Sequence, residues 1–231
     1  MPDSDLDVLV ERAATAGDQI EFLCSRLRPP LTFGPASRRL DDVRRWLYEA
    51  VYRQRFASID RIFGSTDQIE RLAESVVAGR EPPARVATLG CGIGRESIAL
   101  ARLGFDVTGV DFSPTAIDRA REAAADAGVA ATFVVDDLTD LRHVDGPFDL
   151  ITDFGALSDL RRSLRSSYLT NLVSLTRPGT DYFMFCFRWR VSPAAVRALF
   201  GNHFEFARFE RDPDSGFPDS LDCYLMHRKE V

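Results

Sequence analysis

From residue 85 onward, short apolar runs of strand length alternate with longer segments whose apolar residues recur every three or four positions. The second spacing is typical of helices, and it covers residues 96–104, 113–128 and 164–176. Strands joined by helices require right-handed crossovers, so they form a mainly parallel sheet with helices on both faces. The expected strands are RVATL (85–89), DVTGVD (106–111), ATFVVDD (131–137), FDLITDF (148–154) and DYFMFCF (181–187).

The C-terminal part of the chain does not alternate strands with helices. Residues 204–211 and 221–228 both have strand patterns, and between them lie turn residues (DPDSGFPDS) with no helix. This arrangement predicts an antiparallel hairpin at the edge of the sheet. The expected fold is therefore α/β and Rossmann-like, with a mostly parallel seven-stranded sheet.

The first 80 residues read as helices separated by breaks rich in proline and glycine. We expect residues 1–80 to form a helical cap or lid and residues 81–231 to form the α/β domain. Tyr48 and Tyr52 are four positions apart, which places them on one helix face. Such a stripe is usually core packing, but a closing lid excludes water from a reaction. These two residues are our candidates for lid contacts with a ligand.

Three glycines, Gly90, Gly92 and Gly94, follow the first expected strand in the turn LGCGIGRES. A phosphate-binding loop of the P-loop kind is excluded, because it needs a lysine that this turn lacks. A dinucleotide fingerprint counted from Gly90 puts the charged Arg95 where helix and strand must pack closely. A fingerprint counted from Gly92 ends on Ser97, which is small enough for that position, but it begins two residues too late in the turn. The turn alone leaves a dinucleotide or another adenosine cofactor open.

Acidic residues end the next two expected strands. Asp111 lies 21 residues after Gly90, where a carboxylate can accept hydrogen bonds from both hydroxyls of a ribose. Asp136 and Asp137 end the third strand, where a carboxylate can accept from the amine of adenine. Three successive strand ends thus carry groups that match parts of an adenosine ligand. The alternative is that these acids only cap the helices that follow.

With these motifs in place, the chain resembles the class I S-adenosylmethionine-dependent methyltransferases. The resemblance covers about residues 84–190 and is closest to the small-molecule branch, of the thiopurine and quinone O-methyltransferase kind. It implies a cofactor, S-adenosylmethionine, and a product, S-adenosylhomocysteine. The segments that carry it are VATLGCGIGRESIALARLGFDVTGVDFSPTAIDRARE, FVVDDLTDL, GPFDLITDFGAL and YLTNLVSLTRPGTDYFMFCF.

The resemblance also implies roles for individual residues. The turn Gly90–Cys91–Gly92 and Gly94 would surround the methionine part, and Asp111 would bind the ribose, with Phe112 against adenine. Further along, the implied cofactor contacts are the Asp137 carboxylate, the Leu138 backbone N–H, Asp153 and Phe154.

One position departs from the family pattern. Two residues before the first glycine the family usually has an acid that helps to organise the turn and the ammonium group of the cofactor, and here that residue is Thr88. We expect another residue, Asp153 or one in the N-terminal helices, to compensate.

Fewer residues can be assigned from the sequence to binding of the methyl acceptor. Asp153 and His203 are the candidate catalytic bases, and Arg188 and Trp189 are candidate acceptor contacts. The sequence DFGA stands where enzymes that methylate nucleic-acid bases or protein amides have N/D-P-P-Y, which favours a small acceptor. An S-adenosylmethionine-binding protein without methyl transfer and a nicotinamide-dependent oxidoreductase are the alternative functions.

The composition of the chain bears on its partners, on metal binding and on its location in the cell. The net charge of −6 does not provide the excess of positive charge that binding to duplex nucleic acid requires. The four cysteines are scattered, and no Cys-x-x-Cys pair suggests a metal site. The acidic first residues do not resemble a secretory signal, and no apolar run is long enough to cross a bilayer. We expect a cytoplasmic monomer or homodimer with a small-molecule acceptor, no metal and no membrane partner.

Overall fold

The computed structural model describes residues 45–46, 48–49, 52–53, 66–188, 190–207 and 221–230. The chain divides into two compact units, Met1–Ser65 and Thr66–Val231. In the first unit, the described residues between positions 45 and 53 are helical. The rings of Tyr48 and Tyr52 stack with their centroids 6.1 Å apart, as expected for one helix face. The predictions for residues 1–44 lie outside the described residues.

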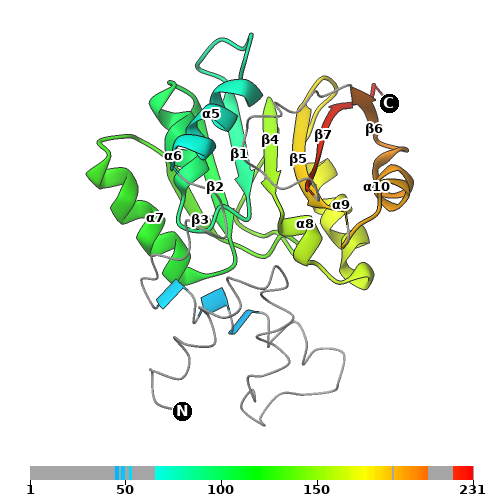
Figure 1. Ribbon diagram of the computed structural model, residues 1–231, viewed down its shortest axis with the longest axis horizontal. Coiled ribbons are helices and arrows are strands. Elements are labelled where there is room, and N and C mark those ends of the chain that lie inside the picture. Colours follow the sequence, from blue (N-terminus) through cyan, green and yellow to red (C-terminus); the bar gives the residue numbers. More distant parts are fainter. Residues whose placement is uncertain are drawn as a thin grey trace. The chain divides into compact units, whose positions relative to one another are not determined.

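The strands described in the second unit form one sheet of seven strands in the order β3-β2-β1-β4-β5-β7-β6 (Figure 1). The first five in this order are parallel, and β7 is antiparallel to both of its neighbours. The fold prediction is confirmed. The strands are β1 (Arg85–Leu89), β2 (Asp106–Asp111), β3 (Thr132–Val135), β4 (Leu150–Phe154), β5 (Asp181–Phe187), β6 (Phe204–Ala207) and β7 (Leu221–Arg228).

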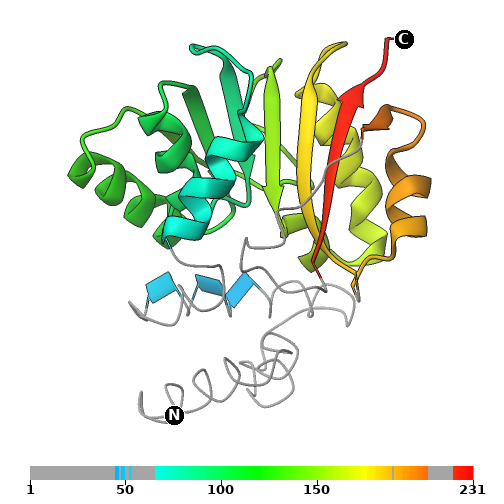
Figure 2. The ribbon, with the colours of Figure 1, turned by 45° about the horizontal axis from the view of Figure 1, so that its top comes forward.

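Helices cover both faces of this sheet (Figure 2). Leu100 of α6 packs with Val86 and Leu150 on one face, whereas Leu172 of α9 packs with Ile151 on the other. This division follows from the alternation of side chains along each strand. The helices are α5 (Thr66–Val76), α6 (Arg95–Arg102), α7 (Pro114–Asp126), α8 (Ala156–Asp159), α9 (Arg165–Ser174) and α10 (Pro193–Phe200), with a 3₁₀ turn at Arg162–Leu164.

The second unit begins earlier than the boundary expected at residue 81. Helix α5 belongs to it, because Leu72, Ala73 and Val76 are buried in the same cluster as α6 and the sheet. An ion pair between Glu70 Oε1 and Arg102 Nη1, 2.7 Å long, joins the exposed sides of α5 and α6. No helix in the described part of the chain is long and apolar enough to span a bilayer.

The C-terminal strands extend the sheet beyond β5. Strand β7 lies between β5 and β6, with Phe183 opposite Leu225 and Phe206 opposite Met226. The predicted hairpin is therefore built so that its second strand is internal and its first strand is at the edge. This order lets the apolar run of β5 be covered on both sides by neighbouring strands.

Candidate functional site

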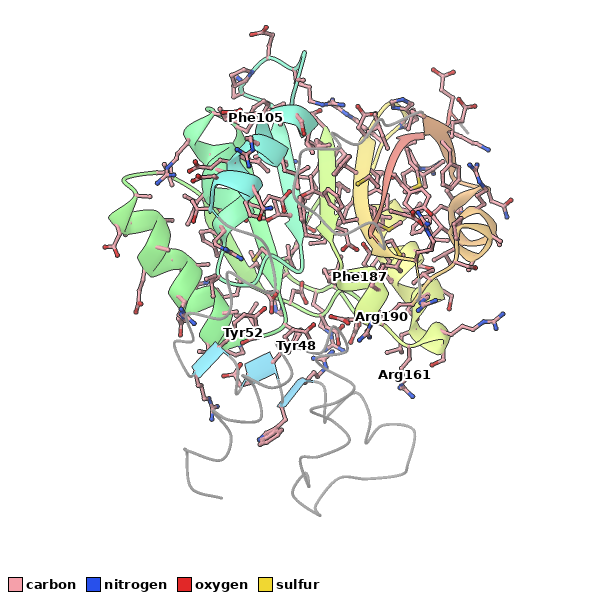
Figure 3. The ribbon with its side chains drawn as sticks, in the orientation of Figure 1. Tyr48, Tyr52, Phe105, Arg161, Phe187 and Arg190 are labelled. Carbon is pink, nitrogen blue, oxygen red and sulfur yellow. The ribbon has the colours of Figure 1, made fainter. Side chains whose placement is uncertain are left out.

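The carboxyl ends of the parallel strands meet at one edge of the sheet. Figure 3 labels Phe105, which directly precedes β2, and Phe187, the last residue of β5, toward opposite ends of the strands. The strand order reverses between β1 and β4, since β2 and β3 continue on one side and β5 on the other. In open α/β sheets, ligands bind at the carboxyl ends beside this reversal. The candidate site therefore lies around the carboxyl ends of β1, β2, β3 and β4.

The glycine turn after β1 has a backbone that only glycine adopts freely. Gly90, Gly92 and Gly94 have φ angles of 68°, 52° and 80°. A Cβ on Gly90 would lie 2.7 Å from the Cβ of Ala156, and one on Gly94 would lie 2.8 Å from that of Ala120. The turn therefore packs tightly against the segment after β4 and against α7, and helix α6 begins immediately after it.

Asp111 ties this turn to the end of β2. One carboxylate oxygen accepts the Gly92 N–H at 2.9 Å, and the other accepts the Ser113 N–H at 2.9 Å. The side-chain cap of α7 is the Ser113 hydroxyl, which accepts the Ala116 N–H at 3.1 Å. The alternative reading of Asp111 as the helix cap is thus not what the structure shows. The buried carboxylate organises the backbone of two loops at the strand ends.

The acidic pair after β3 has two different roles. Asp136 is buried, and its carboxylate accepts the backbone N–H groups of Asp137 at 2.9 Å, Arg142 at 2.9 Å and His143 at 2.7 Å. Asp137 is half-buried, and one of its oxygens accepts both the N–H and the hydroxyl of Thr139 at 2.8 Å. Asp136 therefore shapes the loop, while Asp137 is the acid on its more accessible side.

Asp153 is fully buried at the end of β4. Its carboxylate accepts the N–H groups of Ala156 at 2.6 Å and Leu157 at 3.0 Å, and the hydroxyl of Tyr168 at 2.6 Å. Burial raises its pKa from 3.8 to about 6, although these hydrogen bonds oppose the rise. Because the carboxylate binds the backbone at the start of α8 and the Tyr168 hydroxyl of α9, the geometry favours a positioning role over that of a general base.

Thr88 and Glu96 form the part of the site that sequence reasoning did not resolve. The Thr88 and Ser97 hydroxyls, both buried, lie 2.6 Å apart and share a hydrogen bond. Glu96 is only 9% exposed, and its Oε1 has no hydrogen-bond partner among the described residues. Burial raises the pKa of Glu96 from 4.5 to about 8. An acid in the first turn of a helix is a common sequence feature, so its burial was not apparent from the pattern.

The candidate acceptor residues lie beyond β5. Arg188 Nε donates to both carboxylate oxygens of Asp222, at 3.0 and 3.2 Å, so this exposed residue forms an ion pair with β7. Trp189 lies outside the described residues. Arg190, labelled in Figure 3, is a further candidate: its Nη1 lies 3.2 Å from Asp159 Oδ1, and its side chain is 10% exposed.

His203 is at the wrong end of the sheet for a catalytic role, which corrects the sequence prediction. It directly precedes β6, where Phe204 is opposite Arg228. Arg228 is the last residue of β7, and its N–H binds the Thr180 carbonyl just before β5 begins. His203 therefore lies beside the amino end of β5, separated from the predicted site by the length of the strand. A residue's distance along the chain does not show which end of an antiparallel strand it reaches.

Comparison with known proteins shows what the chain is similar to. Residues 86–179 match a protein family described as Methyltransferase domain. The 2-heptyl-1-hydroxyquinolin-4(1H)-one methyltransferase of Mycobacteroides abscessus is 33% identical over 103 residues, which are 44% of this chain and 45% of that protein. The ubiquinone biosynthesis O-methyltransferase of Xanthomonas campestris is 34% identical over 104 residues, or 45% of this chain and 43% of that one. The matches span less than half the length of these curated relatives.

A solved structure shares the fold. The magnesium protoporphyrin IX methyltransferase of Synechocystis, solved with bound SAH, superposes with a TM-score of 0.61 over 84% of this chain and 95% of that one, at 21% identity. The fold and the sequence matches confirm the resemblance of this chain to class I S-adenosylmethionine-dependent methyltransferases of the small-molecule branch.

Proposed function

We propose that this protein is an S-adenosylmethionine-dependent methyltransferase that transfers a methyl group to an oxygen, sulfur or nitrogen atom of a small molecule by in-line displacement. The observation that carries the proposal is the link between Asp111 and the N–H of Gly92. It joins the acid at the end of β2 to the glycine turn at the end of β1, beside the reversal of strand order. The family match over residues 86–179 supports it.

The residues at the strand ends fit an adenosine cofactor with an amino-acid tail. The carboxylates of Asp111 and Asp137 carry acceptor oxygens of the kind that ribose and adenine need. A buried oxygen, Glu96 Oε1, has no hydrogen-bond partner among the described residues and lies near the end of β4. The glycines of the turn carry no side chains, so its backbone can approach a ligand closely. The N–H groups of Gly90 and Cys91 bind the Val110 carbonyl, which fixes the turn against the end of β2. When bound, S-adenosylmethionine supplies an electrophilic methyl group on its sulfonium.

The chain's own contribution is binding and orientation. We assign ribose binding to Asp111, contacts with the methionine part to Gly90, Cys91, Gly92 and Gly94, and adenine contacts to Phe112, Asp137 and the Leu138 N–H. Holding two reactants in line at near-attack distance supplies a large part of the rate of such transfers. This explains why the site needs no single residue that reacts covalently.

The acceptor side depends on the segments after β4 and β5. Asp153 holds the start of α8 through the N–H groups of Ala156 and Leu157. Phe154, whose ring centroid is 4.7 Å from that of Phe185, continues this wall toward the methionine end. Tyr48 and Tyr52 remain our proposed lid residues. The relatives' names favour hydroxylated aromatic compounds as the first acceptors to test. We also propose that the protein acts in the cytoplasm as a monomer or homodimer, without nucleic-acid partners.

Isothermal titration calorimetry with S-adenosylhomocysteine tests the cofactor assignment. Asp111→Asn removes the charge that accepts the Gly92 and Ser113 N–H groups, so we expect binding to weaken by about 10- to 100-fold, because hydrogen bonds to charged groups contribute roughly 1.5–3 kcal/mol. Asp106→Asn is the matched control, since Asp106 is exposed at the opposite end of β2 and should bind as the wild type does. Absence of binding by the wild-type protein, or a preference for NADH, would refute the proposal.

Formation of S-adenosylhomocysteine with a panel of phenols, thiols and amines then tests the reaction. Turnover with any member confirms methyl transfer. Binding without turnover across the whole panel would favour the alternative, an S-adenosylmethionine-binding protein that transfers no methyl group.

A further inference from the structure

Glu96 is a buried acid that nothing in the described structure neutralises. It is the second residue of α6, two positions after Gly94, and it is 9% exposed. None of the described basic side chains forms an ion pair with it. A buried carboxyl group normally has hydrogen-bond partners, and leaving one without them is costly. An unpaired buried group beside a ligand-binding edge indicates that its partner belongs to the ligand.

The surroundings of Glu96 place it at the reversal of strand order. Thr88 of β1 and Thr152 of β4 are opposite each other in register, so their side chains project from the same face of the sheet. That face carries α6, because the Thr88 hydroxyl binds the Ser97 hydroxyl. The Thr152 hydroxyl approaches the Glu96 carboxyl, yet both the Thr152 hydroxyl and Glu96 Oε1 remain without a completed hydrogen bond.

Asp153 is the other acid near this point, but its side chain projects from the opposite face. There it is bound by Tyr168 and by the backbone of α8. The compensation that the sequence suggested for Asp153 is therefore better met by Glu96. The Thr88 and Ser97 hydroxyls bind each other, whereas the carboxyl group of Glu96, the residue before Ser97, interacts with Thr152 and Asp153 near the end of β4.

We propose that Glu96 receives the ammonium group of the methionine part of S-adenosylmethionine, in place of the acid that Thr88 does not supply. This assignment rests on the proposed function. The ammonium group brings a positive charge and hydrogen-bond donors to an acid that has neither, so the ionised pair forms on binding. Glu96 is a binding residue in this role and takes no part in the methyl transfer itself.

Binding is then coupled to a proton. In the ligand-free protein, burial and the nearby charge of Asp153 keep Glu96 protonated near neutral pH, and the Thr152 hydroxyl opposes this only in part. Among the described residues, Cys91 on the glycine turn also interacts with it, and burial raises the pKa of the Cys91 thiol well above its ordinary value. An incoming ammonium favours the ionised carboxylate, so one proton leaves as the ligand binds.

Two ligands and two variants separate this role from a merely structural one. S-adenosylhomocysteine carries the ammonium group, and its deamino analogue lacks only that group. We expect Glu96→Gln to weaken binding of S-adenosylhomocysteine by about 10- to 100-fold and to leave binding of the analogue unchanged. Glu74→Gln, an exposed position on α5, is the control and should bind both ligands as the wild type does.

Calorimetry at pH 7 in two buffers of different ionisation heat measures the proton. The wild type should release a proton on binding S-adenosylhomocysteine, and Glu96→Gln should release none. Equal affinity of the wild type and Glu96→Gln for S-adenosylhomocysteine would overturn the inference, and so would an equal loss for both ligands. Failure of the wild type to bind S-adenosylhomocysteine at all would instead refute the proposed function.

Discussion

Replacing Glu96 by glutamine should stabilise the protein at alkaline pH and leave it almost unchanged at acidic pH. Burial, the largest cause, raises the pKa of Glu96 from 4.5 to about 8 in the folded protein. The folded state therefore binds this proton more tightly than the unfolded chain does. The resulting stabilisation is fully present below pH 4.5 and is lost as the pH rises through 8. Glutamine has nearly the same shape and is neutral throughout.

The size of the effect follows from this difference in pKa. At about 1.4 kcal/mol per pKa unit, a rise from 4.5 to about 8 corresponds to about 5 kcal/mol of stability. Because water and neighbouring side chains rearrange around a charge that forms in a protein interior, we expect a smaller gain of about 2–3 kcal/mol for Glu96→Gln at pH 8.5.

Urea unfolding of the ligand-free protein at pH 5 and pH 8.5 measures this gain. The wild type should lose stability relative to Glu96→Gln as the pH rises, whereas Glu74→Gln should follow the wild type at both pH values. Parallel pH profiles for the wild type and Glu96→Gln would show that the carboxyl group titrates normally and would refute the reasoning. The same substitution is expected to weaken cofactor binding, so stability and function are opposed at this position.

Two further substitutions test the packing of the site. Gly94→Ala should lower the free energy of unfolding by about 2–4 kcal/mol in urea unfolding, because φ is 80° and the new Cβ would lie 2.8 Å from the Cβ of Ala120 and 2.9 Å from the Phe133 ring; a loss below 0.5 kcal/mol would mean that the turn relaxes freely. Tyr168→Phe removes the hydroxyl that donates to Asp153 at 2.6 Å and should cost about 1–2 kcal/mol. Since that bond favours the ionised carboxylate, the loss should be larger at pH 8 than at pH 5, and an equal loss at both pH values would contradict this assignment.

Local pattern was sufficient for most of the α/β unit. The strand RVATL coincides with β1, DVTGVD with β2 and DYFMFCF with β5, because a parallel sheet buried on both faces requires continuous apolar runs. The candidate ligand-binding edge was also predicted from the sequence, since the carboxyl ends of parallel strands must meet, and the glycines expected in its turn, Gly90, Gly92 and Gly94, have positive φ angles. The short helix α8 was not predicted, because four residues after a glycine carry too little periodicity to be recognised.

Tertiary structure alone decided what each acid does. Sequence placed Asp111, Asp136 and Asp153 at strand ends, but only the three-dimensional contacts show that Asp136 is buried in its own loop and that Asp153 holds α8. The antiparallel insertion of β7 likewise moved His203 to the far end of the sheet. Burial and the direction of a side chain depend on residues distant in the chain. For that reason the sequence did not show that Glu96, an ordinary helix acid by its pattern, is buried with an oxygen that has no hydrogen-bond partner among the described residues.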